Sequence, residues 1–567
     1  MAKQVLHGLN IESPISVIKI DLGTNQKDII SIIKKIDSFH PLFLEEYKIN
    51  ENSLSIISYV IDIWRDASST LEKLSNGEIS LEKADEYIIG KVIHRKLYSM
   101  SSLPILQAAY KKNLEVTNYY SSKGTFELGY EKGYAAETNR NYVLGCGRNS
   151  QIINSLSSSN DSSLAKKIQR DKWGTNTIIE RLGLPIAKWQ VVDSEEELKE
   201  CFNEYTKPIV IKPVGLTGGS GVSVGITTIE QALKGYSDAK KKIDGKVRKN
   251  WQKKIMIQEQ LTGEDYRLLV INGKLKIATK RIPAFVTGNG KSTIKELIEE
   301  TNKDPRRDIT NPSHILKPII IDEPLLNYLK EQNLALDIVP EKDQRIYVRK
   351  VASMSRGGIT EDFTDIVSPE IKLIVESIAT SVHAFSLGAD VMCNDLSKPL
   401  TKENGGIIEI NTMPEAYLNF FPVLGQTREN VAGEYVDELL EFNRTKKIVC
   451  IGNYFENISS LLRRKKIIKK NENVGEIYNG KIKINNYEIN EDVDMWKGIE
   501  GLKINGSLDH IIVQYRDWKD VRNFGLGFNK IDFLFITKKE YSLDKKFMRK
   551  LRKYKHMGLI DKIKVLK

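Results

Sequence analysis

The sequence predicts a multidomain α/β (α+β) protein. Its length, its even spread of apolar residues and its alternation of short strands with amphipathic helices are the observations behind this prediction. The chain has 567 residues, of which 40% are hydrophobic and 28% charged. At about 150 residues per domain the length suggests about four domains, and the composition excludes disordered and low-complexity classes. No apolar run approaches the ~18 residues of a membrane span, and the N-terminus lacks the apolar stretch of a secretory signal.

The cysteines and the charge balance narrow the class further. Four cysteines lie far apart, in neither metal-binding nor disulfide spacing, which favours a soluble protein of the reducing cytoplasm. The net charge is +12, from 86 basic and 74 acidic residues. Much of the excess lies in two Lys-rich segments, which we interpret mainly as solvated faces, with anionic ligands as the alternative. No nucleic-acid-binding signature is present, so nucleic acid is not expected as a partner. Because no apolar run is long enough to span a membrane, a membrane is not expected as a partner either. The segments are Lys240–Lys254 and Lys545–Lys555.

Three domains are expected, covering residues 1–140, 141–442 and 443–567. In the first, apolar periodicity predicts strands and helices but no motif tied to chemistry. The predicted strands are Ile15–Ile20 and Leu114–Asn118, and the predicted helices are Lys27–Ile36, Ser53–Asp66 and Leu103–Lys112. In the second, a helix over Asp171–Arg181 and strands at Trp189–Val192, Pro208–Lys212, Ala389–Cys393 and Gly406–Asn411 are predicted.

A glycine-rich loop follows the strand that ends at Lys212. It runs from Gly215 to Ser223 and contains three further glycines, whose backbone freedom suits a loop that folds over phosphates. Thr217 and Ser220 would add hydroxyl donors. Alone this pattern is a weak signal, since glycine clusters are more often ordinary loops. Gly288–Thr293 is not a phosphate-binding P-loop, because Phe285 stands where that motif requires glycine; a turn before a helix at Thr293–Thr301 is expected instead.

A second candidate site combines Asp390, Glu409 and Asn411. Glu409 and Asn411 are two residues apart on a predicted strand, so both side chains leave the same face. With Asp390 nearby, three oxygen ligands would converge in a way that suits Mg²⁺ between a protein and ATP phosphates. Each acidic residue alone could simply face water, and it is the combination with a lysine-terminated strand and a glycine loop that favours a site.

The order of these motifs resembles the ATP-grasp superfamily. Lys172, Lys212, the glycine loop, the segment Gln258–Asp265, and then Asp390 with Glu409–Asn411 follow that family's arrangement. More specific segments resemble the ATP-grasp half of cyanophycin synthetases, with the bifunctional glutathione synthetases close behind. These segments are Leu144–Arg148, Pro283–Ile298, Asn302–Arg307 and Gly425–Ala432. The resemblance covers roughly residues 140–442.

The resemblance implies roles for individual residues. Lys172 and Lys212 would hold the α- and β-phosphates, Gln258 would meet adenine at a position where the family more often has glutamate, and Asp265 would meet the ribose. The implied ATP contacts are Lys172, Lys212, Thr217, Gly218, Gly219, Ser220, Gly221, Gln258, Glu259, Gln260, Leu261 and Asp265. Asp390, Glu409 and Asn411 match the magnesium ligands. The candidate catalytic residues are Lys280 and Arg281, facing the γ-phosphate, and Arg267, which could also bind an acidic substrate.

This resemblance implies an ADP-forming carboxylate–amine ligase that acts through an acyl phosphate, with ATP and Mg²⁺, in a dimer or tetramer. The alternatives are a glutathione-synthetase-like γ-glutamyl ligase and a non-catalytic ATP-binding scaffold. The substrate is an open question, because Ser355-Arg356-Gly357 replaces the relatives' Ser-Thr-Gly. Arg356 could bind a substrate carboxylate or form a surface ion pair, and Arg148 is a further candidate for an acidic substrate.

The last 125 residues resemble a shortened Mur-ligase domain. Where such domains carry a P-loop, Ile448–Ser460 has no lysine to hold phosphates. Asn523–Thr537 still resembles a Mur strand region, but the Asp-His pair that follows it in the family is missing. We expect no ATP hydrolysis in this part and no catalytic effect of Asn453→Ala.

Overall fold

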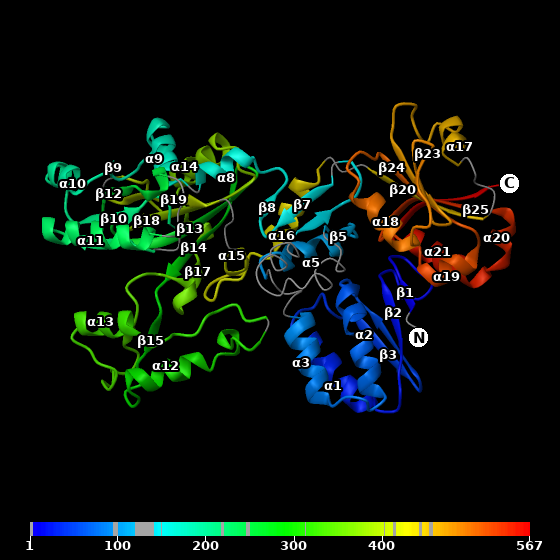
Figure 1. Cartoon of the computed structure of the whole chain (residues 1–567), viewed down its shortest axis with the longest axis horizontal. Coiled ribbons are helices and arrows are strands. Elements are labelled where there is room, and N and C mark those ends of the chain that lie inside the picture. Colours follow the sequence, from blue (N-terminus) through cyan, green and yellow to red (C-terminus); the bar gives the residue numbers. More distant parts are fainter. Residues whose placement is uncertain are drawn as a thin grey trace. The chain divides into compact units, whose positions relative to one another are not determined.

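The computed structural model describes residues 4–566 except 94–99, 120–140, 149, 170, 217–219, 245–249, 312, 402, 412–415, 442–444 and 453–457. The chain divides into two compact units (Figure 1). Unit 1 comprises residues 1–154, 310–313 and 432–567, and unit 2 comprises residues 155–309 and 314–431. Within the described residues, no helix is long and apolar enough to cross a membrane.

Unit 2 contains a small four-stranded sheet that carries the lysine-terminated strand. Its strands are β9 (Trp189–Val192), β10 (Ile209–Pro213), β11 (Ser223–Ile226) and β12 (Ile255–Glu259), in the order β11-β10-β12-β9. Isoleucines of three strands pack on one face against α10 (Glu195–Phe202) and α11 (Ile229–Ile243). Both helices begin at a side-chain cap, from Ser194 and from Thr228, which satisfies an otherwise unpaired backbone N–H.

A five-stranded antiparallel sheet is the larger layer of unit 2. Its strands are β13 (Glu264–Ile271), β14 (Lys274–Ile282), β17 (Ile359–Asp362), β18 (Ser386–Cys393) and β19 (Gly405–Asn411), in the order β17-β14-β13-β18-β19. The turn from β13 to β14 places Asn272 at φ +46° and Gly273 at φ +71°, the conformation that an Asn-Gly hairpin favours. One sheet face packs against α14 (Pro369–Ser381) and against Ile179 of α9 (Lys172–Arg181).

A third layer of unit 2 is a small subdomain between β14 and β17. It has the strands β15 (Phe285–Thr287) and β16 (Arg345–Tyr347) and the helices α12 (Ile294–Asn302) and α13 (Glu323–Glu331) around its own apolar cluster. The helix predicted after Gly288–Thr293 is confirmed: Thr293 caps α12 in a capping box with Glu296.

The N-terminal part of unit 1 is an antiparallel sheet with helices. Its strands are β1 (Gln4–Leu6), β2 (Val17–Asp21), β3 (Glu46–Asn50) and β4 (Ser53–Ile57), in the order β1-β2-β4-β3. The helices are α1 (Gln26–Asp37), α2 (Ile61–Ser75), α3 (Leu81–Tyr87), η1 (Ile88–Ile93) and α5 (Leu103–Lys111). The prediction of one helix over Ser53–Asp66 is wrong in its first part. Residues 53–56 alternate serine with apolar residues, a period of two that pairs with β2 and β3 as a strand.

The C-terminal part of unit 1 is a seven-stranded sheet. Its strands are β20 (Lys446–Ile451), β21 (Val474–Tyr478), β22 (Lys481–Ile484), β23 (Tyr487–Asn490), β24 (His510–Tyr515), β25 (Ile531–Thr537) and β26 (Ile560–Leu566), in the order β23-β22-β21-β24-β20-β25-β26. The five strands from β21 to β26 in that order are parallel, and β22 and β23 add an antiparallel hairpin. The helices α18 (Met495–Ile504), α19 (Trp518–Phe524) and α21 (Lys545–His556) cover one face, and α17 (Ile458–Arg464) covers the other.

The remaining elements are short. They are β5 (Val116–Asn118), β6 (Tyr142–Leu144), β7 (Gln151–Asn154), β8 (Ser157–Ser158), α8 (Ser163–Gln169), η2 (Asn250–Lys253), η3 (Pro305–Arg307), η4 (Met354–Arg356), η5 (Thr364–Ile366), α15 (Tyr417–Phe420), α16 (Asn430–Leu439) and α20 (Lys538–Leu543). The strands β5, β6 and β7 pair antiparallel.

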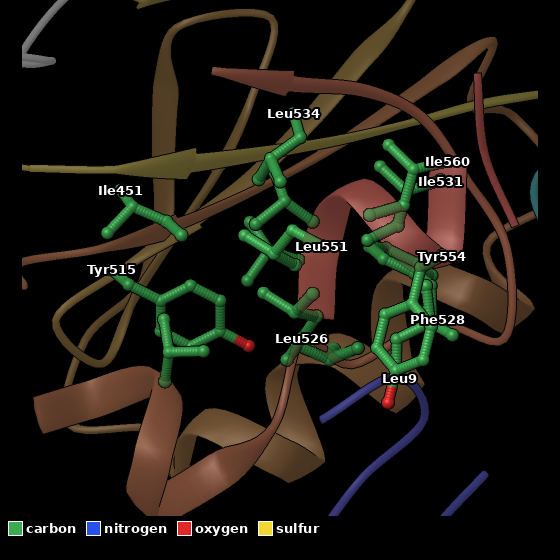
Figure 2. Close-up of a cluster of buried hydrophobic side chains, with 14 of the residues drawn as sticks. Leu9, Ile451, Tyr515, Leu526, Phe528, Ile531, Leu534, Leu551, Tyr554 and Ile560 are labelled. Carbon is green, nitrogen blue, oxygen red and sulfur yellow. The ribbon is translucent and has the colours of Figure 1, made fainter. Parts of the chain in front are cut away.

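The first residues of the chain belong to the core of the C-terminal sheet. Leu9 is fully buried among Phe528 and Tyr554 (Figure 2). The backbone of Leu9 pairs with that of Phe528 and Leu526 through N–H···O bonds of 2.8 and 2.7 Å, and the Tyr554 hydroxyl donates to the Asn10 carbonyl at 2.8 Å. Residues 1–154 and residues 432–567 therefore belong to the same compact unit. The predicted boundaries at 140/141 and 442/443, and the Mur-like character of the last part, stay predictions.

A buried ion pair joins two segments of unit 1 that are almost four hundred residues apart. Lys503 of α18 lies 2.7 Å from the Glu115 carboxylate, and these side chains are only 6% and 3% exposed. The second oxygen of Glu115 accepts the backbone N–H of Asn529 at 2.7 Å. Removing one partner would leave a buried charge without compensation.

We therefore expect Glu115→Gln to lower the free energy of unfolding of unit 1 by about 3–5 kcal/mol, the usual cost of breaking one side of a buried pair. Urea unfolding followed by tryptophan fluorescence would measure it. The exposed pair between Lys530 and Asp561, 3.6 Å apart, offers a matched control; Asp561→Asn should change stability by less than about 1 kcal/mol. Equal effects of the two variants would contradict this account.

Candidate active site

One buried lysine and one partly buried lysine define one side of the candidate site. Lys212 of β10 and Gln258 of β12 lie on the sheet face turned away from α10 and α11, and the Lys212 ammonium donates to Gln258 Oε1 at 2.6 Å. Lys172, the first residue of α9, donates to the Leu216 carbonyl at the start of the glycine loop. Within the described part of the chain, neither lysine forms an ion pair with a carboxylate.

The positive charge of Lys172 makes the charged form of the Lys212 side chain less favourable. Burial, together with the positive charge of Lys172, lowers the pKa of Lys212 from 10.5 to about 8, and Glu409 opposes the shift. Burial also lowers the pKa of Lys172, again opposed by Glu409. Because Glu409 acts on both lysines, its strand β19 brings a carboxylate within electrostatic range of them. A multiply charged anion placed among these groups would relieve the repulsion.

Charged side chains gather on one face of the five-stranded sheet. Arg281 lies directly opposite Asp265, Arg267 opposite Asp390, and Asp390 opposite Glu409. Residues opposite one another in an antiparallel pair share a face, and residues two apart on a strand do so as well. The register therefore places all five on the face that α14 does not cover.

Asp390 is the centre of this charged face. Its carboxylate is bound by Arg267 through two hydrogen bonds and by Arg281, whose Nη2 lies 3.1 Å away. Arg281 also donates twice to Asp265, at 2.5 and 3.0 Å. Burial raises the pKa of Asp265 while Arg281 opposes the change, so this carboxyl depends on its arginine to stay charged. The predicted ribose contact at Asp265 is thus engaged with Arg281 in this structure.

The predicted metal ligands fit a divalent cation in donor type and in placement. Asp390 and Glu409 stand opposite each other on β18 and β19, and Asn411 follows two residues later on the same face, with its amide 3.5 Å from Glu409. Glu409 and Asn411 are partly exposed, so their oxygens are accessible. Among the described residues no three His, Cys, Asp or Glu side chains gather as a metal site. The set has only two carboxylates, so phosphate oxygens would complete the coordination.

Lys280 and Arg281 point to opposite sides of β14. Lys280 stands opposite Tyr266, which packs in the core under α14, and its ammonium lies 3.0 Å from Glu264 and over the Phe363 ring. Neighbouring residues of a strand face opposite ways. The predicted pair of γ-phosphate cations is therefore separated by the sheet, and Arg281 alone shares a face with Asp390.

Three further predicted ATP contacts, Glu259, Gln260 and Leu261, lie at the end of β12 and directly after it. The Glu259 carboxylate accepts the backbone N–H of Thr206 at 3.0 Å, and Gln260 Oε1 accepts that of Gly225 at 2.6 Å. Leu261 lies against the first residues of β19. The side-chain oxygens of Glu259 and Gln260 are thus engaged by backbone N–H groups. Leu261 is the apolar residue of the three and could contact a ring.

The glycine loop is described only in part. Thr217, Gly218 and Gly219 lie outside the described residues, as does Asn453 of the C-terminal part. Ser220 and Gly221 form the turn before β11, where Gly221 has φ +75°. That left-handed backbone conformation is one that glycine adopts without strain.

Arg148 is not part of unit 2, to which the residues described above belong. It belongs to unit 1, where its guanidinium pairs with Asp509 at 3.1 Å and donates to the Ser507 carbonyl at 3.2 Å. Its predicted substrate role stays a prediction.

The Ser355-Arg356-Gly357 turn lies at η4 of unit 2. Arg356 is 56% exposed and lies 3.6 Å from Asp322, which is the surface ion pair that the sequence left open as an alternative. The Ser355 hydroxyl lies 3.0 Å from that of Ser353, and Gly357 ends the turn at φ +92°. The substrate role of this turn stays a prediction.

Two further polar pairs on the charged face were not predicted. Buried Thr279 of β14 donates to Asn419 at 2.7 Å, and Asp362 of β17, opposite Thr279, pairs with Arg428 at 2.5 Å. Arg428 belongs to the segment 425–432, one of those that resemble the cyanophycin synthetases. This resemblance was the only feature of the sequence that could have pointed to Arg428. The face thus continues beyond the metal ligands across three more strands, β13, β14 and β17.

Taken together, the geometry offers cations for phosphate groups, ligands for a divalent cation and arginines for developing negative charge. Lys172 and Lys212 carry charge without a carboxylate partner, which is unfavourable unless an anion binds. Arg267 and Arg281 are held by carboxylates on a partly buried face, so they are pre-oriented. Such an arrangement suits transfer of a phosphoryl group.

Residues 170–281 match the family model described as phosphoribosylglycinamide synthetase, ATP-grasp (A) domain. A cyanophycin synthetase from Synechocystis sp. is 34% identical over 306 residues, covering 54% of this chain and 34% of that protein. The glutathione biosynthesis bifunctional protein GshAB from Clostridium perfringens is 33% identical over 285 residues, covering 50% of this chain and 35% of that protein. The chain thus spans about a third of the length of these curated relatives.

Among solved structures, a bifunctional glutathione synthetase from Pasteurella multocida is similar, with a TM-score of 0.47 and 22% identity, covering 65% of this chain and 47% of that one. The matched residues 170–281 include Lys172, Lys212, Gln258, Asp265, Arg267 and Arg281. Residues 170–281 thus match an ATP-grasp domain, and about half of the chain is similar in sequence to the cyanophycin synthetases.

Proposed function

We propose that this protein is an ATP-dependent, ADP-forming ligase that joins a carboxylate to an amine of an amino acid or small peptide. The observation that carries the proposal is the pairing of buried Lys212 and partly buried Lys172, which form no ion pair with a carboxylate among the described residues, with a charged sheet face that begins at Glu409. Cyanophycin synthetases and GshAB proteins, named for amide-forming biosynthesis, are its relatives.

The proposed division of labour follows the positions of the side chains. Lys172 and Lys212 would bind the phosphates of ATP, and the segment Glu259–Leu261 would lie along its base. Mg²⁺ held by Asp390, Glu409 and Asn411 would offset charge on the phosphoryl oxygens. Lys280 has no role in this proposal, because it lies on the other face of β14.

The proposed reaction has two steps. A substrate carboxylate oxygen attacks the γ-phosphorus, the bond to the β-phosphate oxygen breaks, and ADP leaves with that electron pair. The resulting acyl phosphate is attacked by an amine, which loses a proton as the carbon–oxygen bond to phosphate breaks. Arg281 and Arg267 would stabilise the negative charge that develops on the phosphoryl group and on the tetrahedral carbon's oxygen.

The proposal is tested by incubating the full chain with Mg²⁺-ATP and pooled amino acids and dipeptides, with ADP release and mass spectrometry as readouts. We expect ADP together with a product lighter than its two reactants by one water. Lys212→Ala and Glu409→Ala should abolish both without unfolding the protein. ATP binding without ADP release from any pool would favour the scaffold alternative.

A comparison of neighbours on β14 tests the role of the charged face. Arg281→Met should lower the turnover rate about 10²- to 10³-fold, the effect of removing one group that stabilises transition-state charge. Lys280→Met removes the same charge one residue away, on the opposite face, and should leave turnover within about threefold of the unchanged protein. Steady-state ADP release measures both. Comparable losses would place the reacting phosphate elsewhere.

The lowered pKa of Lys212 predicts proton uptake when ATP binds. In the free protein its pKa is about 8, so above pH 8 the side chain is mostly neutral, and nearby phosphates would restore its charge. ATP affinity should therefore fall as the pH rises above 8, with uptake approaching one proton per ATP. The same shift affects the folding stability of the nucleotide-free protein. Between pH 8 and 10.5 the lysine keeps its proton in the unfolded chain but loses it in the folded protein. The free energy of unfolding should therefore rise with pH over this range.

Titration calorimetry at pH 8.5 in two buffers of different ionisation enthalpy measures this uptake. Lys212→Arg is the control, since its guanidinium is charged at every pH in the range and should take up no proton at this position. Equal uptake by the two proteins would show that another group titrates.

A further inference from the structure

The strongest charged surface outside the proposed active site is the outer face of α21, the helix Lys545–His556. Residues 538–567 contain twelve Lys or Arg and three Asp or Glu, so this segment supplies nine of the chain's twelve net positive charges. The helix itself has no acidic residue. The apolar residues of α21 are buried on the seven-stranded sheet, so its cations are left facing solvent.

The cations follow one side of the helix. Lys545, Arg549 and Lys553 are four residues apart, which at 1.5 Å per residue spaces them about 6 Å along a single row. Lys546 and Lys555 flank this row, and all five are exposed. We call these five residues the basic face. Within the described part of the chain, none of the five side chains forms an ion pair or a hydrogen bond.

Carboxylates near the basic face in the sequence are already engaged elsewhere. Asp544, at the start of α21, pairs with Arg522, and Asp561, after its end, lies 3.6 Å from Lys530. The repulsion within the helix is visible at Lys550. Burial lowers the pKa of Lys550, and the positive charges of Lys553, Lys48 and Lys546 lower it further, with Glu12 as the one opposing charge among those that act on it. A positive field left uncompensated in this way favours an external anion.

Apolar side chains stand exposed at both ends of the basic face. Leu543, just before α21, is 64% exposed, and Met557, just after it, is 52% exposed. Met557 continues the helical conformation, which at 100° per residue puts it on the same side as Lys546 and Lys553. A row of cations between two exposed aliphatic side chains has the chemistry of an interfacial lipid-binding surface.

We propose that the basic face of α21 binds the surface of an anionic phospholipid membrane, with Leu543 and Met557 entering the headgroup boundary. Phospholipid phosphates would take the place of the missing carboxylates. The buried apolar side of α21 is committed to the sheet, so binding would be shallow and mainly electrostatic. A lipid surface fits better than nucleic acid, because the basic face offers no aromatic side chain for stacking on a base, and the two exposed aliphatic side chains beside it have no role in contacts with phosphodiesters.

The test is co-sedimentation of the full chain with vesicles of phosphatidylglycerol and phosphatidylcholine, compared with vesicles of phosphatidylcholine alone. We expect binding to the anionic vesicles only, and weakening as salt is raised, because surface charges are screened. The triple variant Lys545→Gln, Arg549→Gln, Lys553→Gln should bind about 100-fold more weakly, about fivefold for each cation lost near an anionic surface.

A matched triple variant controls for total charge. Arg464, Lys465 and Lys470 are exposed on and after α17, which covers the opposite face of the same sheet. Their replacement by glutamine should leave vesicle binding within about twofold. Leu543→Ser with Met557→Ser should weaken binding to anionic vesicles while leaving its salt dependence unchanged, and circular dichroism would verify that all variants are folded.

Several outcomes would overturn the proposal. These are no binding to anionic vesicles, an equal loss in the control triple variant, or tighter binding of duplex DNA or of polyglutamate than of vesicles through the same three residues. None of these measurements involves ATP turnover, so failure here is separate from failure of the proposed ligase activity.

Discussion

The alternation of side chains across the five-stranded sheet of unit 2 is the constraint on which its chemistry depends. Every second residue of β13 and β18 packs under α14, and the residues between them include the charged Asp265, Arg267 and Asp390. A shift of one residue in any strand would exchange the two sets and bury Arg267 or Asp390 in an apolar core. The Asn272-Gly273 turn helps to fix the register, since its left-handed geometry determines where β14 begins.

The same constraint explains why the charged face is stable without a ligand. Asp390 is almost fully buried, and two arginines neutralise it, while Asp265 shares one of them. A divalent cation at Asp390 would compete with both guanidinium groups. Binding of nucleotide and metal would therefore change the partners of Arg267 and Arg281, and the freed guanidinium groups would face the phosphates. Lys212 differs, since it has only an amide oxygen as its partner and its charge is weakly held.

Local patterns in the sequence were sufficient for much of this architecture. The helix at Thr293, the Asn-Gly hairpin and the strand that ends in Glu409 and Asn411 each follow from turn chemistry, capping or a period of two. Long-range pairing was not accessible in this way. The segment after Ser53 is apolar enough for either a helix or a strand, and its pairing with β2 and β3 decided for the strand. The separation of Lys280 from Arg281 is a property of strand geometry that the order of motifs does not contain.

Surface properties were the least predictable. The sequence shows that Lys545–Lys555 is basic, but not that its neighbouring carboxylates are engaged by other cations or that Leu543 and Met557 are exposed. Likewise, Arg148 is adjacent in sequence to a motif of the resemblance, yet its partner is Asp509, more than three hundred and fifty residues away. Ion pairs between distant segments depend on the tertiary structure and leave no local pattern.

The location of Leu9 in the core of the C-terminal sheet has a consequence for synthesis on the ribosome. Unit 2 is almost continuous in sequence and can acquire its core while the rest of the chain is still being made. Leu9 precedes Phe528 and Tyr554 in the sequence with all of unit 2 between them, so these residues meet only after unit 2 has been translated. Unit 1 is therefore completed last, and its earliest segment waits, with its apolar side chains exposed, until the final strands arrive.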